Sequence, residues 1–192
     1  MRLVILGGSG SGKSTQAQRL CSHLDIPRSS TGEILRQAIA AQTELGKQAQ
    51  PYVAKGELVP DEMMIEFIKE RLLQPDVVGG WLLEGYPRTA FQAEELDFLL
   101  DELQPQLDWA IYLQVSEAVM MSRSVARSAL RAAAKLSLPD DAPQIVQRRI
   151  DLFHKRTVPI LEYYGYRERL LTINAEPSEQ QVQQEILEKL KS

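Results

Sequence analysis

Apolar residues follow two spacings in this chain, one typical of buried strands and the other of amphipathic helices. Residues 3–6 form an unbroken apolar run, as in a buried strand of a parallel sheet. Further on, apolar side chains recur at the spacing i, i+3, i+4 and i+7 in Ala17, Leu20, Cys21 and Leu24. This spacing places them on one face of a helix, so the pattern predicts a strand followed by a helix.

The same two patterns alternate along the rest of the sequence. We expect strands near residues 2–6, 26–30, 81–84, 109–115 and 170–174. Helical patterns separate them, and the one between Gly46 and Pro60 should end at Gly56. Alternating strands and helices favour a parallel sheet with right-handed crossovers. The predicted fold class is therefore α/β, a three-layer fold with a five-stranded parallel sheet and helices on both faces.

Small polar residues precede several predicted helices, where a side-chain oxygen can accept a bond from a free backbone N–H. We expect N-caps at Ser30 or Thr31, Asp61, Ser116, Asp141 and Ser178. The last two begin the pattern of a capping box, which Gln144 and Gln181 complete three residues later. Pro159 lies inside a helical stretch and should kink it.

A glycine-rich loop joins the first strand to the first helix. The segment Gly7–Thr15 reads GGSGSGKST and matches the pattern G-x-x-x-x-G-K-[ST]. Glycines allow successive backbone N–H groups to turn inward around an anion, and the helix N-terminus adds partial positive charge. Lys13 can reach the outer phosphates of a nucleotide, and Ser14 or Thr15 can offer a hydroxyl to phosphate or to Mg²⁺. The alternative is an ordinary Gly/Ser turn, which the flanking strand and helix disfavour.

A second group of polar residues follows the strand near residues 81–84. Glu84 stands at the carboxyl end of this strand, where α/β sheets bind ligands and where an acid helps to hold Mg²⁺. Arg88 follows through a Gly–Pro turn, and Gln92 lies one helical turn further on. The sequence therefore predicts a ligand site that combines this strand end with the glycine loop.

Composition narrows the class of protein. The chain has 192 residues with 44% hydrophobic and 25% charged side chains, which suits one soluble domain. Its net charge of −4 argues against general nucleic-acid binding. Cys21 is the only cysteine and lies on an apolar helix face, so we expect a core residue and no internal disulfide. No apolar run is long enough to cross a membrane, and we expect no signal peptide because the first strand begins beside Met1.

Four motifs in order resemble the adenylate kinases, within the nucleoside monophosphate kinases. They are the TGEILR segment at 31–36, KGELVPDE at 55–62, GYPRT at 85–89, and Gln92. The resemblance runs almost end to end and is weakest between about 128 and 139. It implies a P-loop NTPase core over 1–30, 61–123 and 139–192, an AMP-binding insert over 31–60, and a short lid over about 124–138.

The resemblance also implies a reaction, MgATP + AMP ⇌ 2 ADP, in a monomeric cytoplasmic enzyme of nucleotide homeostasis with Mg²⁺ as cofactor. The implied ATP-binding residues are Gly10, Ser11, Gly12, Lys13, Ser14, Thr15, Arg123 and Arg127. The implied AMP-binding residues are Thr31, Gly32, Arg36, Glu57, Leu58, Val59, Gly85, Arg88 and Gln92. The catalytic cations would be Lys13, Arg88, Arg123 and Arg149, while Glu84, acting through water, and Ser14 would serve the metal.

The sequence departs from the family pattern at several of these places. Glu84 stands where the family usually has aspartate, and Ser9 and Ser14 replace a usual proline and glycine. In the lid, Leu138–Pro139 stands where a Gly-Arg pair is common, so one catalytic arginine is missing.

Good helix formers fill the stretch before that gap, so we expect the helix after Ser116 to continue towards Leu136. It would carry Arg123, Arg127, Arg131 and Lys135 at intervals of four along one face. Arg131 or Lys135 would then replace the missing arginine on lid closure. The alternative is a solvated cationic stripe.

Two other functions stay open at this point. One is a kinase of the same fold that prefers a pyrimidine monophosphate, and the other is a nucleotide-binding regulator without transferase activity. By residue type alone, Thr31 could be a plain N-cap, and Gln92 could face solvent. Thr31 and Gln92 match the family positions that contact adenine, so the resemblance favours AMP as the acceptor. A site built for hydrogen bonds to adenine rejects a base that leaves its polar groups unpaired.

Overall fold

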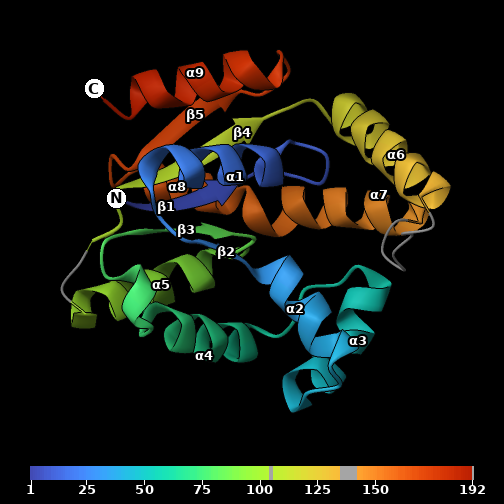
Figure 1. Cartoon of the computed structure of the whole chain (residues 1–192), viewed down its shortest axis with the longest axis horizontal. Helices are drawn as coiled ribbons and strands as arrows, with labels where there is room; N and C mark the ends of the chain where they lie inside the picture. The colour runs from blue at the N-terminus through green and yellow to red at the C-terminus, as the bar shows by residue number, and fades with distance from the viewer. Residues whose placement is uncertain (104–105, 135–141, 192) are drawn as a thin grey trace.

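The structure is a computed structural model that describes residues 1–103, 106–134 and 142–191. Its centre is a parallel sheet of five strands in the order β2-β3-β1-β4-β5 (Figure 1). The strands are β1 (Arg2–Leu6), β2 (Arg28–Ser30), β3 (Trp81–Glu84), β4 (Trp109–Gln114) and β5 (Leu170–Asn174). The predicted α/β fold class is therefore confirmed, and the strands differ from expectation only at the start of β2 and the end of β4.

Helices cover both faces of this sheet. In chain order they are α1 (Lys13–Leu24), α2 (Thr31–Ala40), α3 (Glu44–Lys55), α4 (Asp61–Leu72), the short 3-10 helix η1 (Pro75–Val77), α5 (Ala90–Leu103), α6 (Glu117–Ala133), α7 (Pro143–Leu152), the π-helical turn η3 (Phe153–Thr157), α8 (Pro159–Gly165) and α9 (Glu179–Lys189). No helix in the described ranges has both the length and the apolar character to cross a membrane.

The apolar run of β1 is explained by its central place in the sheet. Its register pairs Val4 with Leu83 on one side and with Ala110 on the other. Successive side chains point to opposite faces, so Val4 enters the apolar layer that includes residues of α4, α5 and α8, whereas Leu3 enters the layer of α1 and α9. Because both layers are apolar, neither face of the strand can carry a polar residue.

The predicted helix ends were right in some places and wrong in others. Ser178 and Gln181 form the expected capping box of α9. Ser30 and Ser116 occupy N-cap positions, although neither side chain bonds to its helix. The prediction for Asp61 was wrong, because Pro60 is the N-cap of α4 and Asp61 is its first helical residue.

The predicted capping box at Asp141 was also wrong. Ala142 occupies the N-cap position of α7 and Pro143 begins the helix, where the missing N–H of proline costs nothing. Asp141 itself lies outside the described residues.

Helices α2 and α3 pack on each other beside the β2 edge of the sheet (Figure 1). Thr43 caps α3 by accepting a bond from the backbone N–H of Gly46 at 3.1 Å. The helix ends at Gly56, whose φ of 69° is left-handed, so this end was predicted correctly. Pro60 then leads into α4, and residues 31–60 thus form a lobe next to the sheet.

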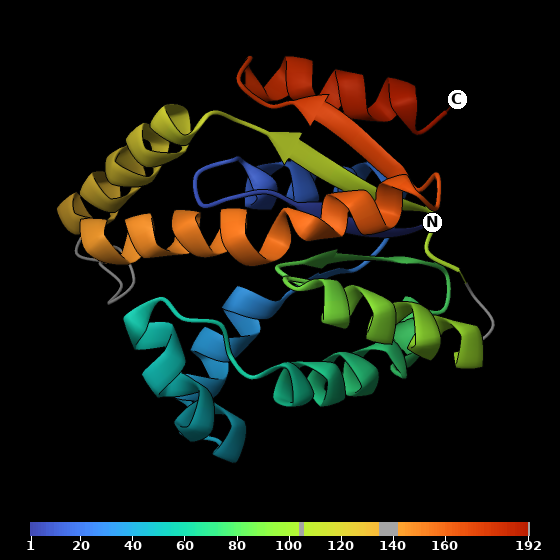
Figure 2. The same cartoon turned by 180° about the vertical axis from the view of Figure 1, so that it is seen from behind.

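Helices α7 and α8 run as one interrupted rod along the molecule (Figure 2). The π-helical turn η3 separates them, and Pro159 begins α8, so the predicted interruption near Pro159 is confirmed. The neighbouring helix α6 continues beyond Arg127 as predicted but ends at Ala133, with Ala134 as its C-cap, so the predicted end near Leu136 was wrong. Lys135 lies outside the described residues.

Candidate active site

The glycine loop runs from the end of β1 to the start of α1. Gly12 is the N-cap of α1 and has a left-handed φ of 91°. Gly10 is left-handed as well, with φ of 81°, and a Cβ there would collide with the backbone carbonyl of Met120 on α6. No other residue type meets both conditions at Gly10. The loop therefore lies directly against the helix that carries the predicted ATP-binding arginines.

Lys13 lies inside this loop. Its Nζ donates to the carbonyl oxygens of Gly7 and Gly8, each at 2.6 Å. The pKa of Lys13 is lowered to about 7, mainly by burial and in smaller part by the cations of Arg88, Arg127 and Arg149, while Glu84 opposes this shift. An anion in the loop would supply the negative charge that this buried ammonium lacks.

Glu84 and Ser14 meet beside the loop, as the sequence predicted for a metal site. The Ser14 hydroxyl donates to Oε1 of Glu84, which is 7% exposed. The donor set of hydroxyl and carboxylate oxygens fits Mg²⁺, which takes oxygen ligands and usually keeps several waters.

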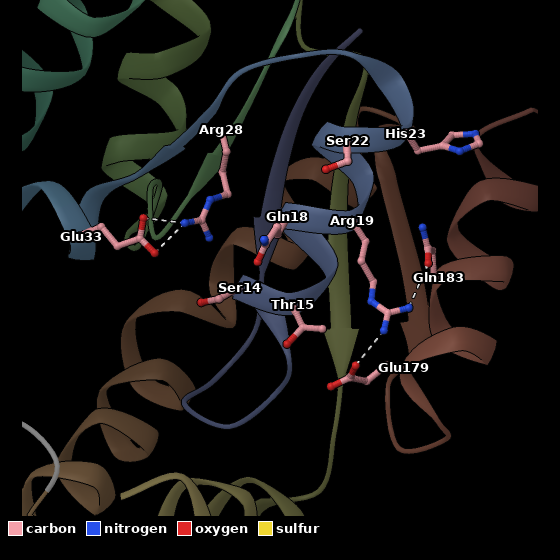
Figure 3. A pocket seen from close by; sticks show the side chains of 10 residues that line it. All are labelled: Ser14, Thr15, Gln18, Arg19, Ser22, His23, Arg28, Glu33, Glu179 and Gln183. Atoms are coloured by element: carbon pink, nitrogen blue, oxygen red, sulfur yellow. Dashed lines mark hydrogen bonds and ion pairs between the residues drawn. The ribbon is translucent and has the colours of Figure 1, made fainter. Parts of the chain in front are cut away.

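Two residues missed by sequence reasoning complete this cluster. Arg28 donates from Nη1 to Oε2 of Glu84 at 3.0 Å and from Nη2 to both carboxylate oxygens of Glu33. Figure 3 shows the pair of Arg28 and Glu33 at one side of a cavity of about 700 Å³, which Ser14 and Thr15 also line. Arg19 pairs with Glu179 elsewhere in the same cavity at 2.9 Å. The signal for Arg28 was weak, because its short strand has poor propensity and a lone arginine suggests a solvated side chain.

A second cavity, of about 40 Å³, lies between the sheet and the lobe of residues 31–60. Its lining includes every residue predicted for AMP, namely Thr31, Gly32, Arg36, Glu57, Leu58, Val59, Gly85, Arg88 and Gln92. Arg149 lines it as well, together with Leu35, Val53 and Met64. Sequence reasoning missed the last three because apolar residues on helix faces resemble ordinary core positions.

Three of the lining residues are arginines from different elements. Arg88 donates from Nε to the carbonyl of Gly85 at 2.7 Å, and its own carbonyl accepts from the Thr157 hydroxyl at 2.9 Å. Burial lowers the pKa of Arg88 to about 10, with Arg149 and Arg36 acting in the same direction, so the guanidinium stays charged at neutral pH. Cations gathered around a buried cavity favour a phosphate group.

Thr31 is buried in the wall of this cavity, and its side chain makes a contact beyond its own helix. Its hydroxyl donates to the backbone carbonyl of Glu84 at 3.2 Å, which ties α2 to the end of β3. Gly85 has a left-handed φ of 85°, and a Cβ on it would press on the Thr31 hydroxyl. This close approach requires glycine at position 85.

Arg127 and Arg123 of α6 donate hydrogen bonds to two different loops. Arg127 donates to the Ser9 hydroxyl of the glycine loop at 3.4 Å, and Ser9 in turn lies 3.2 Å from the hydroxyl of Ser124. Arg123 donates instead to the carbonyls of Ala175 and Glu176, at 2.8 and 2.9 Å. The loop after β5 is where the family resemblance places adenine, so Arg123 lies at the base end of the expected ATP site and not at its phosphate end.

Comparison with known proteins shows the family of this chain. A family model described as adenylate kinase matches residues 5–169. The chain belongs to the adenylate kinase family. It is 69% identical to adenylate kinase 2 of a Nostoc species over 99% of this chain and 98% of that protein. It is 56% identical to adenylate kinase 2 of a Synechocystis species, over 99% and 100% of the two chains, and 41% identical to adenylate kinase of Bifidobacterium longum, over 91% of each.

The cavity between lobe and sheet is too small for a nucleotide in this adenylate kinase. Ligand pockets usually have volumes of about 300–1,000 Å³, whereas this one has about 40 Å³. Gly56, at the end of α3, lies against Ile145 of α7, and a Cβ on it would crowd the Ile145 side chain. The structure therefore has the lobe packed on α7, and a monophosphate can enter only if the lobe moves away.

Proposed function

We propose that phosphoryl transfer takes place between the glycine loop and the cavity of residues 31–60, with Lys13, Arg88, Arg123 and Arg149 as the catalytic cations. The activity is that of the family, the reversible transfer of a phosphoryl group from ATP to AMP that gives two ADP. The observation that carries the site assignment is electrostatic. Arg88 and Arg149 line the AMP cavity and also lower the pKa of Lys13 in the glycine loop. The glycine loop and the AMP cavity therefore share one group of cations.

This arrangement suits the chemistry of phosphoryl transfer. The reaction needs no covalent protein nucleophile, since the enzyme aligns donor and acceptor and spreads positive charge over the moving group. In our proposal Lys13 holds the ATP phosphates, Arg36 and Arg88 hold the AMP phosphate, and Arg149 lies between them. Arg123 starts at the Ala175 and Glu176 carbonyls and would have to leave them to reach phosphate.

Mg²⁺ is the proposed cofactor. Ser14 would offer its hydroxyl, and Glu84 would hold water molecules of the ion rather than the ion itself. The bound ion would neutralise phosphate charge and orient the ATP oxygens. The bond from Ser14 to Glu84 already brings both groups to the same edge of the glycine loop.

We also propose how the chain is divided and where it works. Residues 31–60 would move as the AMP-binding insert and about 124–138 as a short lid on the remaining core, although 135–138 lie outside the described residues. Closure of both parts would exclude water, which otherwise would hydrolyse ATP.

A monomeric enzyme of the cytoplasm is the proposed form, and the single buried cysteine suits a reducing compartment.

Steady-state formation of ADP tests the proposal. ATP and Mg²⁺ are supplied with AMP, CMP, UMP or GMP in turn, and we expect AMP to be turned over fastest. Lys13→Met should remove activity, while Lys47→Met, at an exposed lysine that pairs with its neighbour Glu44 on α3, should not. Faster turnover of CMP or UMP would identify a pyrimidine kinase, and binding without turnover would identify a regulator.

A further inference from the structure

Gln92 is a fully enclosed amide in the wall of the AMP cavity. It lies on the first turn of α5 and is 2% exposed. Its backbone N–H donates to the Thr89 hydroxyl at 3.1 Å, and its backbone carbonyl accepts from the Tyr86 hydroxyl at 3.2 Å. The main chain around Gln92 is thus held in place, and the remaining freedom is the direction of the side-chain amide.

Two partners fix that direction. The backbone N–H of Arg88 donates to Oε1 of Gln92 at 2.8 Å, and Nε2 of Gln92 donates to Oδ1 of Asp61 at 2.7 Å. A backbone N–H can only donate, and an ionised carboxylate can only accept. A flip of the amide would place N–H against N–H and oxygen against carboxylate, so only one orientation is compatible with both partners.

The fixed amide leaves one donor and one acceptor for a ligand. An amide has two N–H groups and two lone pairs on oxygen, and the bonds to Asp61 and Arg88 use one of each. Adenine offers a matching pair on either side of its amino group, an N–H donor beside a ring-nitrogen acceptor. A 6-oxo purine has an acceptor in place of that donor, and a fixed Gln92 would meet it oxygen to oxygen.

We propose that Asp61 is the residue that fixes Gln92 for a 6-amino purine and thereby sets the base specificity of the acceptor site. The inference rests on the proposed function, in which this cavity takes AMP. Asp61 reaches Gln92 from the first turn of α4, directly after the lobe, and its Oδ1 also lies 3.4 Å from the Thr89 hydroxyl. It is a positioning residue, since it acts on the base through Gln92.

The test compares AMP with inosine monophosphate, its 6-oxo counterpart, in the full chain with Asp61→Asn. Asparagine has nearly the same shape but can present N–H as well as oxygen, so it no longer excludes the flipped amide. The ratio of kcat/KM for AMP to that for inosine monophosphate should fall by about tenfold, the effect of one oriented hydrogen bond. Glu62→Gln is the matched control, because it removes the same charge from the same helical turn and should leave the ratio unchanged.

A second measurement uses the unmodified enzyme and is needed if Asp61→Asn does not fold. Purine riboside monophosphate has hydrogen at position 6, so it neither satisfies nor opposes Gln92. A fixed amide predicts the order AMP, then purine riboside monophosphate, then inosine monophosphate in kcat/KM. A freely flipping amide would place inosine monophosphate ahead of the unsubstituted purine and would overturn the proposal.

The two proposals fail differently. No turnover of AMP would refute the proposed function. Normal turnover of AMP, with an unchanged ratio in Asp61→Asn, would refute only the role of Asp61.

Discussion

Arg148 on α7 and Glu57 in the loop after α3 form an ion pair, with 2.6 Å between Nη2 and Oε1. The side chain of Arg148 is 52% exposed, yet it holds the lobe of residues 31–60 to the core. Glu57 also lines the AMP cavity, beside the contact between Gly56 and Ile145. The pair therefore joins two parts that must separate for AMP to enter.

Arg148→Gln should favour the open lobe and ease the entry of AMP. Exposed ion pairs contribute about 0.2–1 kcal/mol, so we expect KM for AMP to fall by up to about fivefold, with little change in KM for ATP. Glu57→Gln should have the same effect, and the double variant should add nothing to either single change. The control is Arg71→Gln, which breaks the pair of Arg71 with Asp76 away from the cavity. Full additivity of the two single effects would show that the pair carries no coupling.

Glu84→Gln should raise the Mg²⁺ concentration needed for half-maximal activity. A neutral amide no longer attracts the ion's water molecules, and changes in such outer ligands cost about 10–100-fold in metal affinity. Binding of Mn²⁺ in the presence of ADP, followed by electron paramagnetic resonance, should weaken by a similar factor. An unchanged Mn²⁺ affinity would remove Glu84 from the metal site.

Arg28→Gln should act in the opposite direction. Arg28 places a cation between Glu84 and Glu33, and its removal leaves two carboxylates without that counter-charge. We expect tighter Mn²⁺ binding, by roughly tenfold for one partly buried unit charge. Arg19→Gln removes a charge from the same cavity, but its partner is Glu179, so it should leave Mn²⁺ affinity unchanged. Weaker Mn²⁺ binding in Arg28→Gln would mean that Arg28 mainly holds Glu84 in position.

Arg127→Ala should damage ATP use more than Arg131→Ala. Arg127 reaches the Ser9 hydroxyl in the glycine loop and contributes to the lowered pKa of Lys13. A hydrogen bond to a charged group contributes about 1.5–3 kcal/mol, so we expect kcat/KM for ATP to fall at least tenfold in Arg127→Ala. Arg131→Ala should stay within twofold of the unmodified enzyme at saturating ATP and AMP. A loss of kcat as large as that of Arg123→Ala would instead identify Arg131 as the replacement for the missing lid arginine.

Cys21 should react slowly with thiol reagents in the folded chain. Burial raises the pKa of its thiol to about 11, from an ordinary value of 9.0. About one thiol in a thousand is then ionised at pH 8, against about one in ten in the unfolded chain. Labelling by a disulfide reagent at pH 8 should therefore be at least a hundredfold slower without urea than with it, and Cys21→Ala should not be labelled. Fast labelling of the native protein would contradict the core position.

The same shift gives a pH dependence of stability. The folded pKa lies above the unfolded one, so the thiol's contribution to the free energy of unfolding is complete below pH 9 and falls as the pH rises towards about 11. Urea unfolding at pH 8 and pH 10.5, compared between the unmodified chain and Cys21→Ala, measures this contribution. An equal decrease in both proteins would assign the loss to other groups.

The sequence by itself determined the fold class, the glycine loop before α1 and the set of residues that line the cavity beside residues 31–60. These features depend on local pattern: an apolar run buried on both faces, a glycine loop before a helix, and short motifs at ligand-facing strand ends. Each predicted AMP residue lines a single cavity in the structure, because the parallel sheet brings the carboxyl ends of β2 and β3 to one edge. The left-handed end of α3 at Gly56 was likewise predictable from a single residue type.

Only the tertiary structure decided which side chains meet across elements. Arg28 on β2 and Glu84 on β3 are 56 residues apart, and Arg148 and Glu57 are 91 apart, so no spacing in the sequence indicates either pair. Asp61 looked like a helix cap because it follows a turn and precedes a helical pattern, whereas packing of α4 on α5 turns it towards Gln92. Long-range pairs depend on where the backbone brings two elements together. A local sequence pattern does not indicate how close in space two elements lie when they are remote in the sequence.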